Sequence, residues 1–177
     1  MATTAIEVID TAVKIGLGGL ITLLGTIAVT KLNHGHENKK ETNKRFYDAL
    51  ESVGANIEEM THVSLRYWAL IIEWARNNQQ GFGLTEKRQE ELERTKIDMF
   101  DQFKNLTVAE SKLLLLDLDE PATLLREYGE FLKDLRRKYY DGKASLTEED
   151  MELVREQLLV KREVLFKSLS ESYKKGL

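Results

Sequence analysis

An uncharged stretch near the N-terminus constrains this chain of 177 residues more than any other feature. Lys14 and Lys31 bracket 16 residues without charge, and residues 15–29 read IGLGGLITLLGTIAV. A helix needs ~20 mostly apolar residues to cross a bilayer core. Lysines at both ends can lay their aliphatic stems along an apolar helix and keep the ammonium groups at the interface. We therefore predict a transmembrane helix over residues 11–32.

Three other interpretations of residues 11–32 stay open: a buried core helix, a signal peptide and a peripheral amphipathic helix. A signal peptide carries positive charge before its apolar run, whereas Glu7 and Asp10 precede this one. A peripheral helix needs a polar face, which residues 15–29 lack. A buried core helix differs from a span only in whether the segment contacts lipid.

The positive-inside rule gives the predicted orientation. Only Lys14 is basic before the apolar run, and five basic residues follow it: Lys31, Lys39, Lys40, Lys44 and Arg45. We therefore expect a single-pass protein of a bacterial inner membrane, with the N-terminus outside and the larger part cytoplasmic. The predicted parts are a short extracytoplasmic leader (1–10), the transmembrane helix (11–32), a basic juxtamembrane stalk facing lipid headgroups (33–45) and a cytosolic helical sensor and oligomerisation domain (46–177).

Small residues recur along the predicted span. Gly18, Thr22 and Gly25 lie on one side of a helix. Small side chains let helix backbones approach closely in lipid, so these three residues predict self-association of the span. The alternative is that glycine is simply tolerated in a membrane helix.

A heptad pattern predicts one long helix after the span. Its nine seam positions alternate in steps of four and three, and all but Ser64 are apolar or aromatic: Phe46, Leu50, Val53, Ile57, Met60, Ser64, Tyr67, Ile71 and Trp74. This spacing is typical of a helix with a coiled-coil-like seam. The same register extends back into residues 11–32. The region between is then either a continuous helical stalk or a linker that Gly35 interrupts.

Two shorter helices are predicted next. Thr85 can cap a helix over residues 85–105. Thr107 and Glu110 then have the spacing of a capping box, which predicts a new helix there. That helix contains LLLL at 113–116, and an all-apolar run predicts deep burial.

Two more helices complete the prediction. We expect Asp119 to cap the first and the turn at Asp141 to end it. The second covers residues 147–174 and opens on Thr147 and Asp150, spaced like a capping box. With one proline and no strand pattern, the fold class is all-α: an N-terminal transmembrane helix, then a cytosolic bundle of about five helices that includes a long heptad-patterned helix.

Catalytic signatures are absent from the sequence. There is no cysteine, which excludes thiolate chemistry, and no P-loop, G-x-S-x-G or H-E-x-x-H motif. Clusters of carboxylates such as Glu90 and Glu91 are typical of solvated helix faces. The net charge of −4 disfavours binding of duplex nucleic acid. We therefore expect no enzymatic activity, no cofactor and no metal site.

Two basic–aromatic patches are the candidate ligand-binding residues. The first comprises Arg66, Trp68, Arg76 and Asn77, and the second Arg136, Arg137, Lys138 and Tyr140. Cations can hold phosphates, and flat rings and amides can hold bases, so both patches suit a nucleotide messenger. The structural alternative is that the first patch packs on the heptad seam and the second complements the helix dipole.

The layout resembles the membrane-bound effectors of type III CRISPR defence, which join an N-terminal span to a small helical cytosolic domain. The features that carry the resemblance are the span at 15–29, the basic exit at 31–45 and the helical remainder. The resemblance implies a homo-oligomer, specifically a tetramer, whose cytosolic domain binds cyclic tetra-adenylate and then perturbs the membrane. It transfers no binding residue.

Three functions remain distinct expectations from the sequence. The first is an oligomeric inner-membrane effector in antiviral defence that binds a cyclic oligoadenylate. The second is a membrane-tethered helical adaptor that recruits a protein partner through its apolar seam. The third is a soluble enzyme with an unusual helical site.

Overall fold

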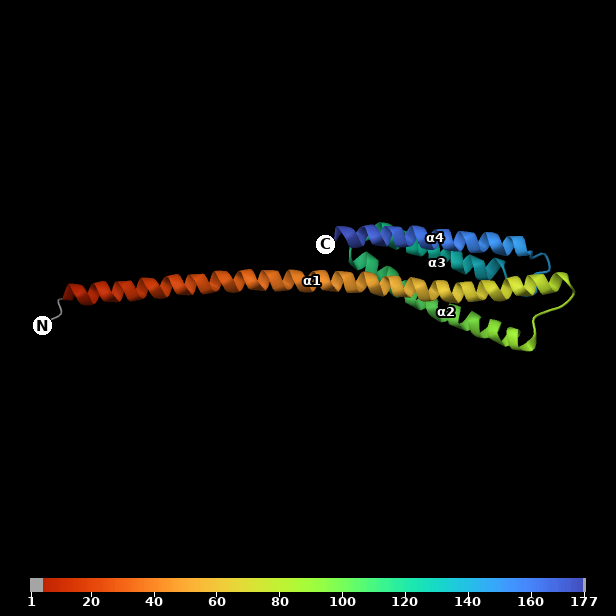
Figure 1. Cartoon of the computed structure of the whole chain (residues 1–177), viewed down its shortest axis with the longest axis horizontal. Helices are drawn as coiled ribbons and strands as arrows, with labels where there is room; N and C mark the ends of the chain where they lie inside the picture. The colour runs from red at the N-terminus through yellow and green to blue at the C-terminus, as the bar shows by residue number, and fades with distance from the viewer. Residues whose placement is uncertain (1–4, 177) are drawn as a thin grey trace. The chain divides into compact units, whose positions relative to one another are not determined.

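The computed structural model describes the backbone of residues 5–176 and the side chains of residues 39–176. Figure 1 shows four helices in chain order: α1 (Ala5–Gln79), α2 (Glu86–Leu115), α3 (Asp119–Lys138) and α4 (Glu148–Lys175). No strand occurs within residues 5–176. The all-α prediction is therefore confirmed over this range.

The chain divides into two units, Met1–Arg45 and Phe46–Leu177. The first unit holds the predicted span at 11–32 with Gly18, Thr22 and Gly25, and these side chains lie outside the described residues. The side chains described in this unit, residues 39–45, are all exposed. Among the residues whose side chains the structure describes, 39–176, no helix combines the length and apolar character needed to cross a membrane.

The second unit is an antiparallel four-helix bundle formed by residues 46–79 of α1 with α2, α3 and α4 (Figure 1). All nine predicted seam positions of α1 are buried, from Phe46 to Trp74. Ser64, the polar member of the seam, is accommodated because its hydroxyl donates to the Met60 carbonyl oxygen at 2.7 Å. The heptad interpretation of this segment is therefore confirmed.

Helix α2 corrects the prediction of one helix over residues 85–105 and a second, short helix that begins at Thr107. Thr107 does not cap a helix, because its hydroxyl donates to the Phe103 carbonyl oxygen of the preceding turn at 3.1 Å. One buried face runs through both halves at seven-residue intervals: Leu92, Met99, Leu106 and Leu113. Continuous burial of this face keeps the helix intact, so the bundle has four helices instead of about five.

The prediction that residues 113–116 are all deeply buried is wrong. Leu113 is fully buried, but Leu115 is 84% exposed. These residues form the last turn of α2, where only one side meets the bundle. The run is therefore a helix end with one core position, not a buried segment.

The helix boundaries around α3 and α4 are partly as predicted. Leu118, not Asp119, is the N-cap residue of α3, and it makes no side-chain capping bond. Helix α3 ends at Lys138, before the predicted turn at Asp141. The capping box of Thr147 and Asp150 is confirmed by bonds in both directions at 3.1 Å.

Candidate ligand-binding site

The first predicted patch, on α1, is used to hold the bundle together. The Trp68 indole N–H donates to the Met151 carbonyl oxygen on α4 at 2.6 Å. Arg76 pairs with Glu148 of α4, with Nη2 and Oε2 2.8 Å apart. These contacts tie the last turns of α1 to the first turns of α4.

The two remaining residues of the first patch also have structural partners. The Asn77 side-chain amide donates to the Gly83 carbonyl oxygen at 3.1 Å, which closes the turn after α1. Arg66 lies between Asp98 and Glu91 on α2, with its Nη2 3.5 Å from Asp98 Oδ2. The structure thus places all four residues of this patch at contacts between helices or at the turn after α1.

The end of α3 packs against α1 next to this patch. The Tyr67 hydroxyl donates to the Tyr139 carbonyl oxygen at 2.7 Å. Burial raises the pKa of Tyr67 well above its ordinary value, so its hydroxyl stays a donor at all physiological pH values. This bond fixes the backbone of Tyr139 just beyond the end of α3.

The segment after α3 is held to α2 by a charged network. The Asp141 carboxylate accepts bonds from Lys96 Nζ at 2.8 Å and from Gln89 Nε2 at 3.0 Å. Partial burial opposes ionisation of Asp141, but these donors outweigh it and hold its pKa below the ordinary value. The bonds therefore define the position of the α3–α4 loop.

Basic residues at this end form what we call the α3-end cluster: Arg136, Arg137, Lys138, Tyr140 and Lys143. Lys138 is neutralised by Asp134 at 2.7 Å. Arg136 and Arg137 are exposed, and neither makes an ion pair or hydrogen bond among the described residues. Tyr140 is also exposed. The second predicted patch is therefore present as a surface cluster with two uncommitted guanidinium groups.

Lys143 belongs to this cluster but was not among the predicted site residues. Its ammonium donates to the Lys138 carbonyl oxygen at 2.8 Å and lies 5.2 Å from the centre of the Tyr139 ring. The sequence gives little sign of this role, because a lysine after a glycine in a turn is usually only a solvated loop residue. The fold turns the chain back and places Lys143 beside the last turn of α3.

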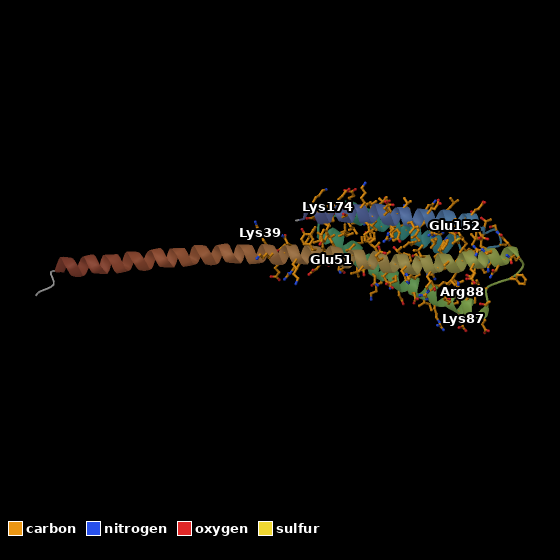
Figure 2. The ribbon with its side chains drawn as sticks, in the orientation of Figure 1. Lys39, Glu51, Lys87, Arg88, Glu152 and Lys174 are labelled. Atoms are coloured by element: carbon orange, nitrogen blue, oxygen red, sulfur yellow. The ribbon has the colours of Figure 1, made fainter. Side chains whose placement is uncertain are left out.

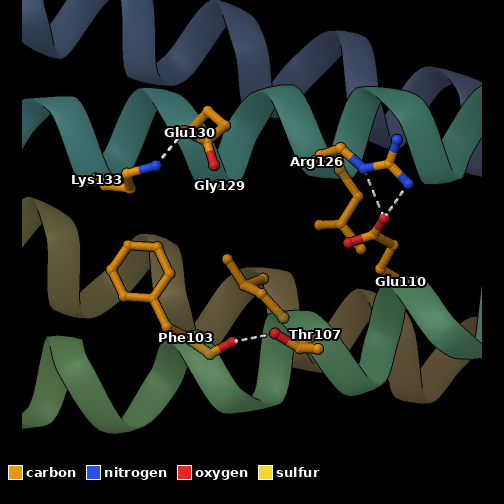
Figure 3. Close-up of a pocket in the computed structure, with 9 residues that line it drawn as sticks. Phe103, Thr107, Glu110, Arg126, Gly129, Glu130 and Lys133 are labelled. Carbon is orange, nitrogen blue, oxygen red and sulfur yellow. Dashed lines mark hydrogen bonds and ion pairs between the residues drawn. The ribbon is translucent and has the colours of Figure 1, made fainter.

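A small cleft between α2 and α3 has about 150 Å³ of space (Figure 3). Its charged lining is paired within the protein: Arg126 Nε bonds Glu110 at 2.8 Å, and Lys133 bonds Glu130 at 2.6 Å. Figure 3 shows these two pairs at the sides of the cleft. With its cations already matched, the cleft carries no excess positive charge for an anionic ligand.

A larger apolar groove of about 430 Å³ lies between α1 and α4. Leu50, Gly54 and Phe166 line it, and Glu51 and Lys174 are among its charged lining residues. Figure 2 shows Glu51 and Lys174 at the same end of the bundle, away from Lys87 and Glu152. The groove is therefore separate from the α3-end cluster.

Among the described residues, the α3-end cluster is the part of either predicted patch that remains available to a ligand. Comparison of the chain with protein-family models, with curated proteins and with solved structures finds no match, so the function has to be inferred from the chain's own residues.

Proposed function

We propose that this chain is a membrane-tethered, non-enzymatic effector whose helical bundle binds an anionic ligand at the α3-end cluster. The observation that carries the proposal is the pair of exposed guanidinium groups of Arg136 and Arg137, which have no internal partner among the described residues. Arginine suits phosphate because its planar fork donates two parallel hydrogen bonds. Tyr140, three residues after Arg137 in the sequence, adds an exposed ring.

The rest of the bundle supports an action by binding instead of catalysis. Three side chains of the first patch, Trp68, Arg76 and Asn77, make hydrogen bonds between helices or at the turn after α1. A ligand at the α3-end cluster would meet a helix end that Tyr67 and Asp141 hold in place. Ligand binding can then shift the arrangement of the chain only through a difference in affinity between two states.

The ligand class follows from charge and from the resemblance to the type III CRISPR effectors. A cyclic oligoadenylate, tetra-adenylate above all, carries phosphates for the two arginines and bases for Tyr140. In this proposal the span at 11–32 holds the bundle at the inner membrane, and the bound messenger alters the membrane part of the oligomer. The expected partners are thus the lipid bilayer, other copies of the chain and the messenger.

Titration of the purified full chain in detergent with cyclic tetra-adenylate tests the proposal by calorimetry. The variant R136E/R137E is expected to lose binding. The matched control is K174E/K175E, because it reverses two adjacent exposed charges in the last turn of α4, as the first variant does in α3. Retained binding in R136E/R137E, or equal loss in both variants, would remove this site.

A second candidate function is a membrane-tethered adaptor that recruits a protein partner. One observation favours it: α2 and α4 expose several large apolar side chains, including Phe100 and Leu153. Affinity capture with the full chain distinguishes the two functions. Recovery of one stoichiometric helical protein, together with no response to the nucleotide, supports the adaptor.

A further inference from the structure

The bundle carries two exposed apolar stripes, one on α2 and one on α4. The α2 stripe consists of Ile97, Phe100 and Val108, with Lys104 between them; the α4 stripe consists of Leu153, Val160 and Val164. Ile97 and Phe100 are 63% and 67% exposed, and Val160 is 58% exposed. Spacings of three, four and seven place each set along one side of its helix. Water-facing stripes of this kind indicate an interaction surface.

The two stripes lie at the same level of the bundle. The Asn56 amide of α1 donates to the Asn105 carbonyl oxygen of α2 at 3.4 Å. Two residues further along the same turn of α1, Glu58 pairs with Arg162 of α4. Residues next to 105 on α2 and next to 162 on α4 therefore share one height along the bundle axis.

The helices that carry the stripes also run in the same direction. Contacts of α1 with α2 join Glu73 to Arg88 and Asn56 to Asn105, so the two helices are antiparallel. Contacts with α4 join Arg76 to Glu148 and residue 58 to residue 162, so α4 is antiparallel to α1 as well. A neighbouring copy in the same orientation can thus bring its α4 beside α2 with the stripes level.

Charge at this level is complementary. Lys104 precedes Asn105, and Glu163 follows Arg162, so the two charges share the common height. Both side chains are exposed, and neither has an ion-pair partner among the described residues. A parallel α2–α4 contact therefore places Lys104 of one copy near Glu163 of the next, beside the apolar residues.

We propose that copies of this chain associate head to tail, the α2 stripe of one copy packing on the α4 stripe of the next. Because the two faces differ, the contact repeats and closes into a ring when the rotation permits. The inference rests on the proposed function in one respect: a span shared by all copies keeps their bundles parallel. It concerns the bundle and is independent of Gly18, Thr22 and Gly25.

Cysteine crosslinking in membranes tests this interface in the full chain, which has no cysteine of its own. Two differently tagged copies, V160C and F100C, are co-expressed and treated with a mild oxidant. The proposal predicts a mixed crosslinked dimer and no crosslink when either variant is expressed alone. A chain with both substitutions is expected to give a ladder of larger species. F82C co-expressed with V160C is the control, because Phe82 is equally exposed but lies in the loop after α1.

Charge exchange gives a second, independent measurement. K104E or E163K alone should reduce the V160C–F100C crosslink, and the combined K104E/E163K chain should recover it. Self-crosslinking of V160C would show a two-fold contact and overturn the proposal, as would the absence of any mixed crosslink. Neither readout uses the nucleotide, so loss of ligand binding with intact crosslinking refutes the ligand site alone.

Discussion

The hydroxyl groups of Thr61 and Tyr128 lie 2.7 Å apart in the buried interior of the bundle and join α1 to α3. Thr61 donates its own proton to the Ile57 carbonyl oxygen, also at 2.7 Å. Tyr128 must therefore be the donor in the bond between the two hydroxyls. Burial raises the pKa of Tyr128 to about 12, which keeps that proton in place.

Because Tyr128 is the donor, substitutions of Tyr128 and of Thr61 should lower the free energy of unfolding by different amounts. Tyr128→Phe removes the donor and leaves Thr61 bonded to Ile57, so it should cost about 1 kcal/mol of unfolding free energy. Thr61→Val leaves a buried tyrosine hydroxyl without its acceptor, which costs roughly 1–3 kcal/mol. Urea denaturation measures both, and the double variant should cost less than the sum of the two. Equal, additive costs would contradict the assigned direction.

Thr107 and Thr147 both have the spacing of a capping box, but only Thr147 begins a helix, so alanine substitutions at the two positions should have different effects. Thr147 caps α4, so Thr147→Ala should cost about 1 kcal/mol. Thr107 lies inside α2, where alanine is the better helix former, so Thr107→Ala should be neutral or stabilise by up to about 0.5 kcal/mol. Thermal unfolding followed by circular dichroism compares them. A loss at Thr107 as large as that at Thr147 would mean that a helix begins there.

The loop after α3 should show a pH-dependent contribution to stability. The pKa of Asp141 is lower in the folded chain than its ordinary 3.8, so its contribution is complete above that value and is lost as pH falls through the folded-state pKa. Asp141→Asn should lower the free energy of unfolding by about 1 kcal/mol at pH 7. This difference from wild type should disappear below pH ~4.

Asp48→Asn is the control for that measurement, since Asp48 is exposed and has no hydrogen bond or ion pair among the described residues. At pH 7 this variant should change the free energy of unfolding little, because Asp48 makes no contact that the substitution removes. A gap for Asp141→Asn that is unchanged between pH 7 and pH 3 would show that the contacts with Lys96 and Gln89 do not depend on its charge.

A substitution of Arg76 tests whether this arginine has a structural role or binds the ligand. Its side chain is 55% exposed and its ion pair with Glu148 is screened by solvent, so Arg76→Ala should change the stability of the bundle little. We expect the affinity for cyclic tetra-adenylate to be unchanged in this variant. Calorimetry with the same titrant measures it, and a marked loss of affinity would return the first patch to the binding site.

The features that could be predicted from the sequence are those that depend on a local pattern of residues. The seam of α1 and the capping box at Thr147 were predictable because each depends on residues close together in the chain. The boundary at Thr107 was misjudged because a capping-box spacing also occurs inside helices. The seven-residue series through Leu92 and Leu113 would have indicated continuity.

The candidate site was less predictable because partners from other helices decide it. Nothing near Trp68 in sequence shows that Met151 accepts its indole proton, or that Glu148 pairs with Arg76. Asp134 pairs with Lys138, and neither Arg136 nor Arg137 has a hydrogen bond or ion pair among the described residues. Sequence identified the residue types, and the fold determined which of them stay available.

Membrane tethering is tested by alkaline carbonate extraction of membranes from cells that express the full chain. We expect the chain to stay in the membrane pellet and L20K/L23K to be released, because each lysine at a span centre costs roughly 3 kcal/mol of insertion. Release of the unmodified chain into the supernatant would show that residues 11–32 do not anchor it.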